Sequence, residues 1–347
     1  MQFKTLGSSG LSVSTLCLGT MTYGVQTPQD DAFAQMDMAV AAGINFFDTA
    51  EMYPVNPITP ETQGDSERIV GAWFKRSGKR RDVILATKHS GNGVSHVRDG
   101  ADISSASVRS AVEGSLKRLG TDYIDLYQLH WPNRGSYMFR QNWTYDPSHQ
   151  DKQATLQHMA DTLGALQAEV DRGTIRHFGL SNESAWGTTK WCDVATGVGG
   201  PRVVSIQNEY SLLCRLYDTD LAEVSVNEVV ALIPFSPLAA GLLTGKYQNG
   251  AIPKGSRMDI NGTLGGRKTD RAFQAVAAYQ KVAQDHGLDL AHMALAWSVQ
   301  RPFVASSIFG ATTVEQLAHL LKCADLVLDQ EVLDAIDAAH HAHPMPY

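Results

Sequence analysis

The chain has 347 residues, of which 43% are hydrophobic and 19% charged, a composition typical of a globular protein with ample material for a core. Its formal net charge of -7, with no basic block, argues against sequence-independent binding to nucleic acid. The first residues lack the pattern of a signal peptide, and no run approaches the roughly 20 apolar residues that a membrane helix needs. The four cysteines form no CxxC pair, so we expect reduced thiols in a cytoplasmic protein.

Short apolar runs rich in β-branched residues alternate with segments of helical periodicity along the chain. The runs predict strands at 13–20, 44–50, 83–89, 124–131, 175–182, 203–210, 229–236 and 306–312. The clearest helical segments are 30–43, 107–120, 155–173 and 270–287, and each ends on a glycine suited to a helix C-terminus. Alternation of this kind is typical of parallel strands joined by crossover helices.

Eight such units in a chain of this length predict an α/β fold, a (β/α)8 TIM barrel formed by residues 1–347 as one domain, with an N-terminal hairpin. No linker composition or internal repeat divides the chain. Three connections are unusually long, at about 90–104, 133–153 and 239–268, after the third, fourth and seventh strands. All three follow the C-terminal ends of strands, the end of a barrel where active sites lie.

Ionisable side chains follow the apolar runs at this same end of the predicted barrel. Asp48 and Tyr53 follow the second strand, Lys88 ends the third and His130 lies at the end of the fourth. A phenol can donate a proton near neutral pH if an ammonium group stabilises the phenolate, and a buried lysine needs a carboxylate partner to stay charged. We therefore expect Asp48 to support Lys88, Lys88 to support Tyr53, and His130 to orient a carbonyl oxygen.

A carbonyl that receives a proton on oxygen must receive something on carbon, and a hydride from nicotinamide is the simplest donor. The alternatives stay open at this point. A lone histidine such as His130 is more often structural, a buried Lys–Asp pair can be purely structural, and Lys88 could serve a barrel aldolase as a Schiff-base amine.

Several motif matches fall short of other functions. The stretch GLLTGKY at 241–247 has the wrong glycine spacing for a P-loop, and GLSNE at 179–183 is not GxSxG. There is no strand-borne GxGxxG, which excludes a standard Rossmann site. The HHAH run at 340–343 has no carboxylate cluster near it in sequence, so we predict no metal site.

The stretches FFDTAEMY (46–53), DYIDLYQLHWP (122–132) and FSPLAAGLLTGKY (235–247) resemble the aldo-keto reductases, and the likeness covers nearly the whole chain. The resemblance implies a catalytic tetrad of Asp48, Tyr53, Lys88 and His130, with Tyr53 as the proton donor in reduction. The long segment 50–67 and the insertion after HWPNR resemble the bacterial Tas-type reductases, which are related to potassium-channel β-subunits.

The resemblance also implies a dinucleotide site along the C-terminal ends of the strands. Its residues would be Gly19, Thr20, Met21 and Asp48 near the nicotinamide ribose; Ser181, Asn182 and Gln207 at the carboxamide; Phe235 against the nicotinamide ring; Ser236, Leu238, Gly241 and Lys246 at the pyrophosphate; Arg257 at the 2′-phosphate; and Gly310, Thr312 and Gln316 at the adenosine.

Lys246 and Arg257 favour NADPH (NADP+) as the cofactor, with NADH less favoured. The chain departs from the family pattern at the adenine, where relatives often continue QLxEN. Here the run is QLAHLL, so His319 and Leu320 stand in place of an acid and an amide.

The aromatic loop after the fourth strand predicts the substrate pocket, with Trp131, Tyr137 and Trp143 as its walls; the alternative is that these rings pack on the barrel rim. The expected partner is a small-molecule carbonyl. Two functions follow from the resemblance: an NADP(H)-dependent reductase of aldehydes or ketones, or an NADP(H)-binding redox sensor with slow turnover that regulates a partner. The sequence predicts neither the natural substrate nor the oligomeric state.

Overall fold

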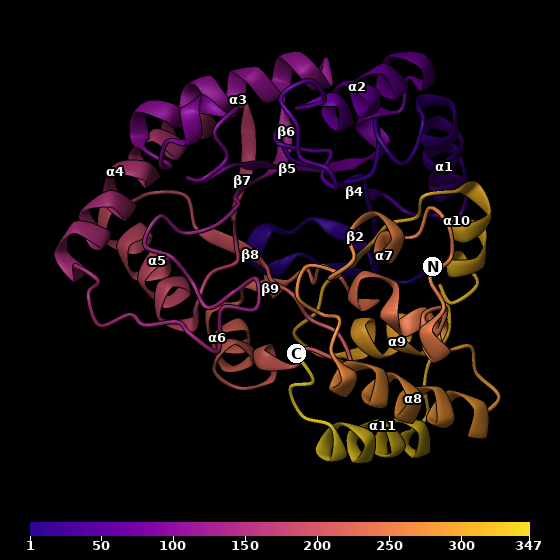
Figure 1. Ribbon diagram of the computed structural model, residues 1–347. Coiled ribbons are helices and arrows are strands. Elements are labelled where there is room, and N and C mark those ends of the chain that lie inside the picture. The colour runs from indigo at the N-terminus through magenta and orange to yellow at the C-terminus, as the bar shows by residue number, and fades with distance from the viewer.

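Eight parallel strands form the central sheet of the computed structural model, which describes residues 1–347 (Figure 1). They are β3 (Leu16–Gly19), β4 (Phe46–Asp48), β5 (Ile84–His89), β6 (Ile124–Leu129), β7 (Ile175–Ser181), β8 (Val203–Gln207), β9 (Ala231–Leu232) and β10 (Ser307–Phe309). The strand order is β10-β3-β4-β5-β6-β7-β8-β9. A parallel bridge between Leu232 and Val304 joins the two edges, and the Ile308 N–H donates to the Pro234 carbonyl at 2.9 Å. The sheet is therefore a closed barrel, and the predicted (β/α)8 fold is confirmed.

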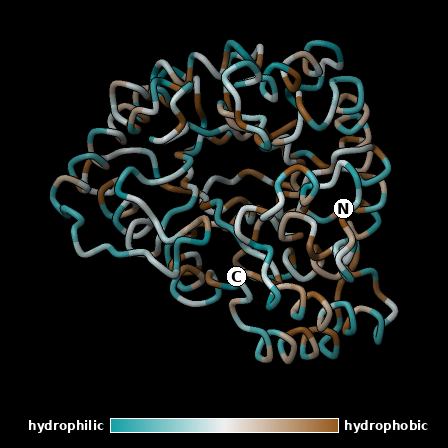
Figure 2. The backbone as a smooth tube through the Cα atoms, in the orientation of Figure 1, coloured by the Kyte–Doolittle hydropathy of each residue, from teal (hydrophilic) through white to brown (hydrophobic).

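Helices surround the sheet with their apolar sides toward it and their hydrophilic sides outward (Figure 2). They are α1 (Gln29–Ala41), α2 (Asp65–Ser77), α3 (Ser105–Leu119), α4 (Lys152–Asp171), α5 (Ala185–Val198), α6 (Asp220–Glu228), α7 (Arg257–Ile260), α8 (Asp270–Asp285), α9 (Leu290–Gln300), α10 (Val314–Leu321) and α11 (Gln330–Ala342). The four helical segments predicted from periodicity coincide with α1, α3, α4 and α8. None of these helices combines the length and the apolarity that crossing a bilayer requires.

The predicted strand bounds need two corrections. The run at 13–20 is two strands, because β2 (Ser12–Ser14) pairs antiparallel with β1 (Phe3–Thr5) and only β3 enters the barrel. The run at 229–236 keeps only the two-residue β9, since Pro234 has no N–H to donate to a neighbouring strand.

The β1–β2 hairpin closes the N-terminal end of the barrel. Leu6 and Val13 are fully buried and pack with inward-facing residues of the strands, among them Phe46. The turn passes so close to β8 that a Cβ on Gly7, whose φ is +50°, would lie 2.0 Å from the Val204 carbonyl oxygen. Only glycine fits at this position. Because the hairpin covers the N-terminal end of the barrel, the open end is the C-terminal one.

The two-residue period of the strands places a polar layer above an apolar one inside the barrel. Phe46, Ala86 and Leu126 belong to the apolar interior cluster. Two residues further along the same strands are Asp48, Lys88 and Gln128, all buried. Because alternate residues of a strand point to the same side, the polar layer lies directly toward the open end of the barrel.

A buried ion-pair network anchors the long connection after β5. The Arg98 guanidinium donates to both oxygens of the Glu51 carboxylate at 2.7 Å, and the Ser90 N–H donates to Glu51 Oε1 at 2.6 Å. The ring of His89 contacts Arg98 and, at 2.9 Å, the Ser107 hydroxyl of α3. Burial lowers the pKa of His89 from 6.5 to about 4; Glu51 opposes the shift and Arg98 adds to it. The imidazole is therefore neutral in the folded protein at neutral pH.

The free energy of unfolding should fall as the pH drops from about 6.5 to about 4, because unfolded His89 takes up a proton that folded His89 does not. Because the pKa of folded His89 is lowered, the contribution of His89 to the free energy of unfolding is complete above pH 6.5. Acidification to about pH 4 removes up to about 3 kcal/mol of stability. Urea unfolding at several pH values should give a shallower pH dependence for His89→Gln than for the native chain. The exposed His149→Gln is the control, and equal slopes for all three proteins would contradict the assignment.

Candidate active site

The centre of the open end is a buried ion pair between Lys88 and Asp48. Lys88 Nζ lies 2.6 Å from Asp48 Oδ2, and the lysine side chain is fully buried. The other carboxylate oxygen, Oδ1, accepts from Nε2 of Gln207 at 2.9 Å and from Nε2 of Gln128 at 3.3 Å. Burial by itself lowers the pKa of Lys88, but Asp48 and Tyr53 outweigh it and the pKa lies above its ordinary value. Lys88 is therefore an ammonium ion.

The three hydrogens of this ammonium group have three acceptors. Besides Asp48, they are the Thr49 carbonyl oxygen at 2.8 Å and the Tyr53 hydroxyl oxygen at 3.4 Å, a long hydrogen bond. An ammonium group only donates, so the Tyr53 oxygen is the acceptor in this contact. The hydroxyl hydrogen of Tyr53 must then point elsewhere, and it is available to a ligand.

The pKa of the Tyr53 phenol is raised above its ordinary value. Burial is the main cause, Lys88 lowers the pKa and Asp48 raises it. The expected effect of Lys88 is thus present, but burial exceeds it. At neutral pH the phenol keeps its proton, which is the form that a proton donor needs.

His130 follows β6 and stands beside the phenol. The rings of Tyr53 and His130 are 5.8 Å apart and nearly perpendicular, at 76°. Burial, Lys88 and His89 together lower the pKa of His130 well below its usual value, so the ring is neutral. Its Nδ1 is buried without a partner. The structure thus brings all four predicted catalytic residues together.

The expected carboxamide-binding residues lie at the ends of β7 and β8. The Ser181 hydroxyl donates to the Gln207 carbonyl at 2.8 Å, and Asn182 Nδ2 donates to the His130 carbonyl at 2.9 Å. Asn182 Oδ1 is buried with no partner. The Gln207 side chain makes its hydrogen bonds within the protein through Nε2, and no protein group donates to its Oε1. Two amide oxygens are therefore free to accept from a ligand.

The expected pyrophosphate segment is a tight turn after β9. Ser236, Ala240 and Gly241 have φ values of 55°, 58° and 93°, so the backbone folds back on itself within a few residues. The exposed Lys246 ammonium group lies close to this turn, because a Cβ on Gly241 would be 3.2 Å from Lys246 Nζ. Leu238 is half-buried and packs against the core.

Arg257 begins α7, and its guanidinium has no hydrogen-bond or ion-pair partner. Burial, with Arg267 next, lowers its pKa. A half-buried cation without a counter-charge is a suitable anion site.

The residues expected at the adenosine and at the ribose lie where β10 meets β3. A Cβ on Gly310 would be 3.1 Å from the Gly19 carbonyl oxygen, so the two backbones are in close contact. Thr312 donates to Gln316 Oε1 through both its N–H and its hydroxyl at 3.0 Å. Thr20 is buried and its hydroxyl donates to the Asp48 carbonyl at 3.0 Å, and the Met21 carbonyl accepts from the Val55 N–H at 3.2 Å.

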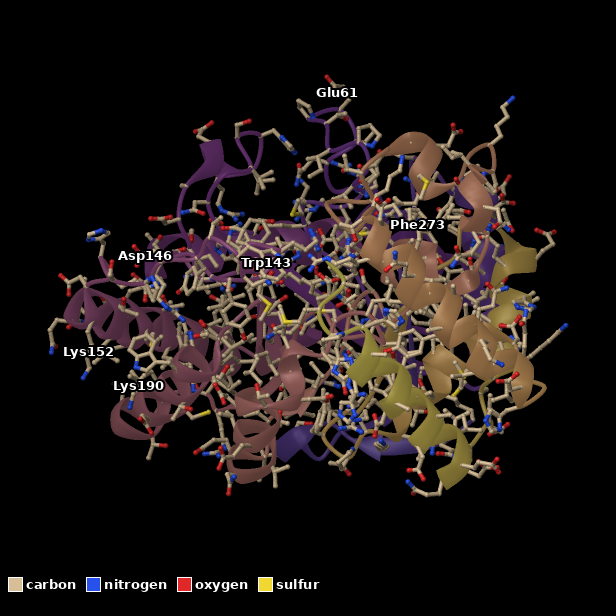
Figure 3. All side chains as sticks on the ribbon, turned by 60° about the horizontal axis from the view of Figure 1, so that its bottom comes forward. Glu61, Trp143, Asp146, Lys152, Lys190 and Phe273 are labelled. Carbon is tan, nitrogen blue, oxygen red and sulfur yellow. The ribbon has the colours of Figure 1, made fainter.

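Aromatic rings line one side of the mouth of the barrel. The rings of His130 and Trp131 are 4.7 Å apart, those of Trp131 and Phe139 are 6.3 Å apart, and those of Phe139 and Phe235 are 6.5 Å apart. Trp143, which is labelled in Figure 3, was expected as a wall of the pocket. Its side chain is instead 58% exposed, and the Arg271 guanidinium lies 5.6 Å from its ring centroid. The reason is that the loop stacks this ring on a surface cation instead of turning it inward.

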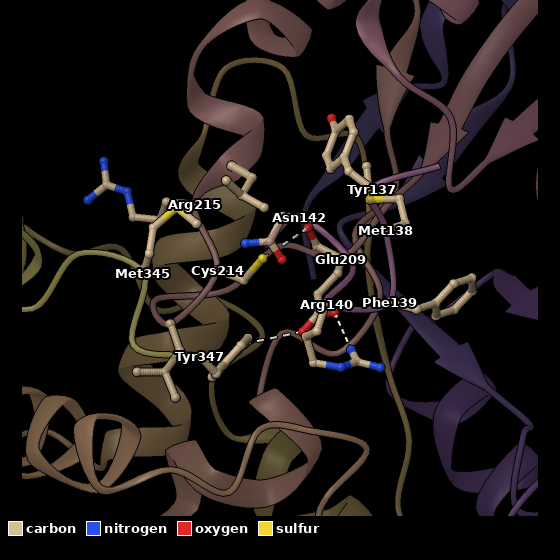
Figure 4. Close-up of a pocket in the computed structure, with 12 residues that line it drawn as sticks. Tyr137, Met138, Phe139, Arg140, Asn142, Glu209, Cys214, Arg215, Met345 and Tyr347 are labelled. Atoms are coloured by element: carbon tan, nitrogen blue, oxygen red, sulfur yellow. Dashed lines mark hydrogen bonds and ion pairs between the residues drawn. The ribbon is translucent and has the colours of Figure 1, made fainter. Parts of the chain in front are cut away.

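Glu209 joins three distant segments next to the mouth (Figure 4). Its carboxylate accepts from Arg140 at 2.8 Å, from Arg267 at 2.8 Å and from the Tyr347 hydroxyl at 3.2 Å. The small cavity here, which Tyr137 also lines, measures about 20 Å³. That is room for about one water molecule and too little for a substrate. The Tyr137 ring lies edge-on to Tyr145, with the ring centroids 6.1 Å apart.

Sequence reasoning did not name three groups that support the site: Gln128, Glu209 with its two arginines, and the Arg98 partner of Glu51. Gln128 had a usable signal, since it lies two residues before His130 in the apolar run predicted as the fourth strand. The ion pairs had none, because their partners are far apart in the chain. Glu67 has a structural role, since its carboxylate accepts from Arg118 and Thr87 at 2.6 Å.

Comparison with known proteins agrees with this geometry. Residues 15–341 match the model of the aldo/keto reductase family. The chain is 44% identical to protein tas of Escherichia coli, covering 100% of this chain and 99% of that one. It is 33% identical to the uncharacterized oxidoreductase YrpG of Bacillus subtilis, covering 96% and 94%. It is 32% identical to a probable voltage-gated potassium channel subunit beta of Arabidopsis thaliana, covering 99% and 98%. The chain therefore belongs to the aldo/keto reductase family, whose members are oxidoreductases that use NAD(P)H.

Proposed function

We propose that the protein is an NADP(H)-dependent reductase that converts small aldehydes or ketones to alcohols. The observation that carries the proposal is the hydrogen bond from Lys88 to the Tyr53 oxygen, which leaves the phenol hydrogen free at the mouth of the barrel. The family and the oxidoreductase relatives support the reaction class.

The residues present fit a nicotinamide dinucleotide. The unpartnered Asn182 Oδ1 and the free Gln207 Oε1 are suited to accept from a carboxamide NH₂ group. Phe235 offers a ring surface, and the exposed Lys246 and the unpaired Arg257 offer cations for phosphates. When bound, the reduced nicotinamide would supply the hydride that the carbonyl carbon needs.

The protein side of the reaction follows from the hydrogen-bond directions. Tyr53 would donate its hydroxyl proton to the carbonyl oxygen, and the Lys88 ammonium would stabilise the phenolate that remains. Neutral His130, at the side of the phenol, would hold the carbonyl oxygen in place, and the Trp131 and Phe139 rings would exclude water. Asp48 would keep the lysine charged throughout.

Tyr53→Phe should retain cofactor binding and lower kcat for 4-nitrobenzaldehyde about 100-fold or more, because it removes the proton donor. Cofactor binding is followed by fluorescence and turnover by NADPH absorbance. The matched control is Tyr127→Phe, which removes a buried hydroxyl that has no partner and faces the helix layer. An unchanged rate in Tyr53→Phe would rule out the assigned donor.

Arg257→Ala should weaken NADPH binding by about 10- to 100-fold and NADH binding much less, since only NADPH carries the 2′-phosphate. Fluorescence titration with both nucleotides gives the two ratios. Lys254→Ala removes an exposed cation from the same loop and is the control. Equal losses for the two nucleotides would argue against a 2′-phosphate contact at Arg257.

A redox sensor with slow turnover is the second candidate, favoured by the likeness to the probable potassium channel subunits. The two functions differ in kinetics and not in the site. A single-turnover experiment with pre-bound NADPH, compared with steady-state turnover, separates them. Fast chemistry with slow steady-state turnover would indicate retention of the nucleotide and favour the sensor.

A further inference from the structure

Three metal-ligating side chains meet on the outside of the barrel, between the start of α9 and the end of α10. Asp289, His292 and His319 each present one ligand atom, and these atoms all lie within 4.8 Å of one another. None of the three belongs to the proposed catalytic tetrad. Asp289 and His319 are exposed and His292 is half-buried, so an ion could reach the cluster from solvent.

The two carboxylate oxygens of Asp289 have different partners. Oδ1 caps α9 by accepting from the N–H groups of Ala291 at 2.8 Å and His292 at 3.0 Å. Oδ2 faces His319 Nε2 at 3.2 Å. The helix cap therefore does not use the oxygen that points at the cluster, and Oδ2 is available as a ligand.

The two imidazoles are already close together. Their ring centroids are 4.5 Å apart with an angle of 30° between the planes. His292 Nε2 lies 2.8 Å from the His319 carbonyl oxygen, which holds the first ring against the end of α10. Tetrahedral ligands of zinc lie roughly 3.3 Å from one another, so the present spacing requires only small side-chain rotations.

We propose that Asp289, His292 and His319 bind a divalent transition-metal ion of the zinc class. Two imidazoles and one carboxylate suit Zn²⁺ or Co²⁺, with water as the fourth ligand, and do not suit Mg²⁺ or Ca²⁺. On binding, the ligating nitrogen of His319 gives up any proton that it shares with Asp289, and the ion takes that place. The His319 carbonyl only accepts, so His292 Nε2 carries a hydrogen in the present contact. On binding, that proton moves through solvent to Nδ1, and Nε2 exchanges the carbonyl for the ion.

The bound ion clips the first turn of α9 to the last turn of α10. Asp289 and His319 lie far apart in the chain, so an ion between them stabilises the folded state and not the unfolded one. The helix that it holds, α10, follows Thr312 and contains Gln316, the residues expected at the adenosine. His319 itself stands where the family pattern has a different residue, so the site is a feature of this chain's own sequence.

The test is metal binding by the untagged, chelator-treated full-length protein. Co²⁺ absorption in the visible range and Zn²⁺ calorimetry should show one equivalent bound with micromolar affinity, and Zn²⁺ should raise the melting temperature. In Asp289→Asn and His319→Gln the affinity should fall about tenfold or more, and the rise in melting temperature should disappear. Asparagine caps a helix as well as aspartate does, so Asp289→Asn should keep α9 intact without metal.

The control is His340→Gln/His341→Gln, which removes two histidines from the rival HHAH run and should bind the ion as the native protein does. Three outcomes would overturn the site: binding only at millimolar Co²⁺ or Zn²⁺, equal affinity in Asp289→Asn and His319→Gln, or loss of binding in the control pair. No step of the test depends on reductase turnover.

Discussion

The donor-only character of the Lys88 ammonium is the constraint on which the candidate site depends. Its three hydrogens go to Asp48, to the Thr49 carbonyl and to Tyr53. This arrangement fixes the direction of the lysine–phenol contact without reference to any ligand. A neutral lysine would lose this property, and the chain prevents that by enclosing a carboxylate beside it. Residues in the interior of the barrel therefore determine the direction of the hydrogen bond at its open end.

Such an ion pair is costly to bury, and the surrounding structure has to compensate for its desolvation. Gln128 and Gln207 do so by donating to the carboxylate oxygen that Lys88 does not use. Removing one partner of a buried pair typically costs about 3–5 kcal/mol, so the four side chains act as one unit. The apolar layer beneath them, with Phe46 and Leu126, excludes water from that side.

The fold and the clustering of Asp48, Tyr53, Lys88 and His130 were predictable from sequence because both depend on short-range pattern. Strand period, helix period and polar residues at strand ends are local signals, and they indicated eight barrel strands and four clustered side chains. Contacts that join distant segments gave no such signal. The exposed ring of Trp143 and the Glu209 cluster were missed because loop conformation depends on tertiary partners such as Arg271 and Tyr347. The split of the first strand was missed because an apolar run does not reveal which sheet it joins.

The hairpin plug at the base of the barrel has a consequence for the order of events. Leu6 and Val13 fill the N-terminal end, so a ligand can enter and leave only on the side of the polar layer. When two ligands share a single opening, the deeper one must bind first and dissociate last. A cofactor that lies deeper than the substrate would then have to bind before the substrate and leave after it.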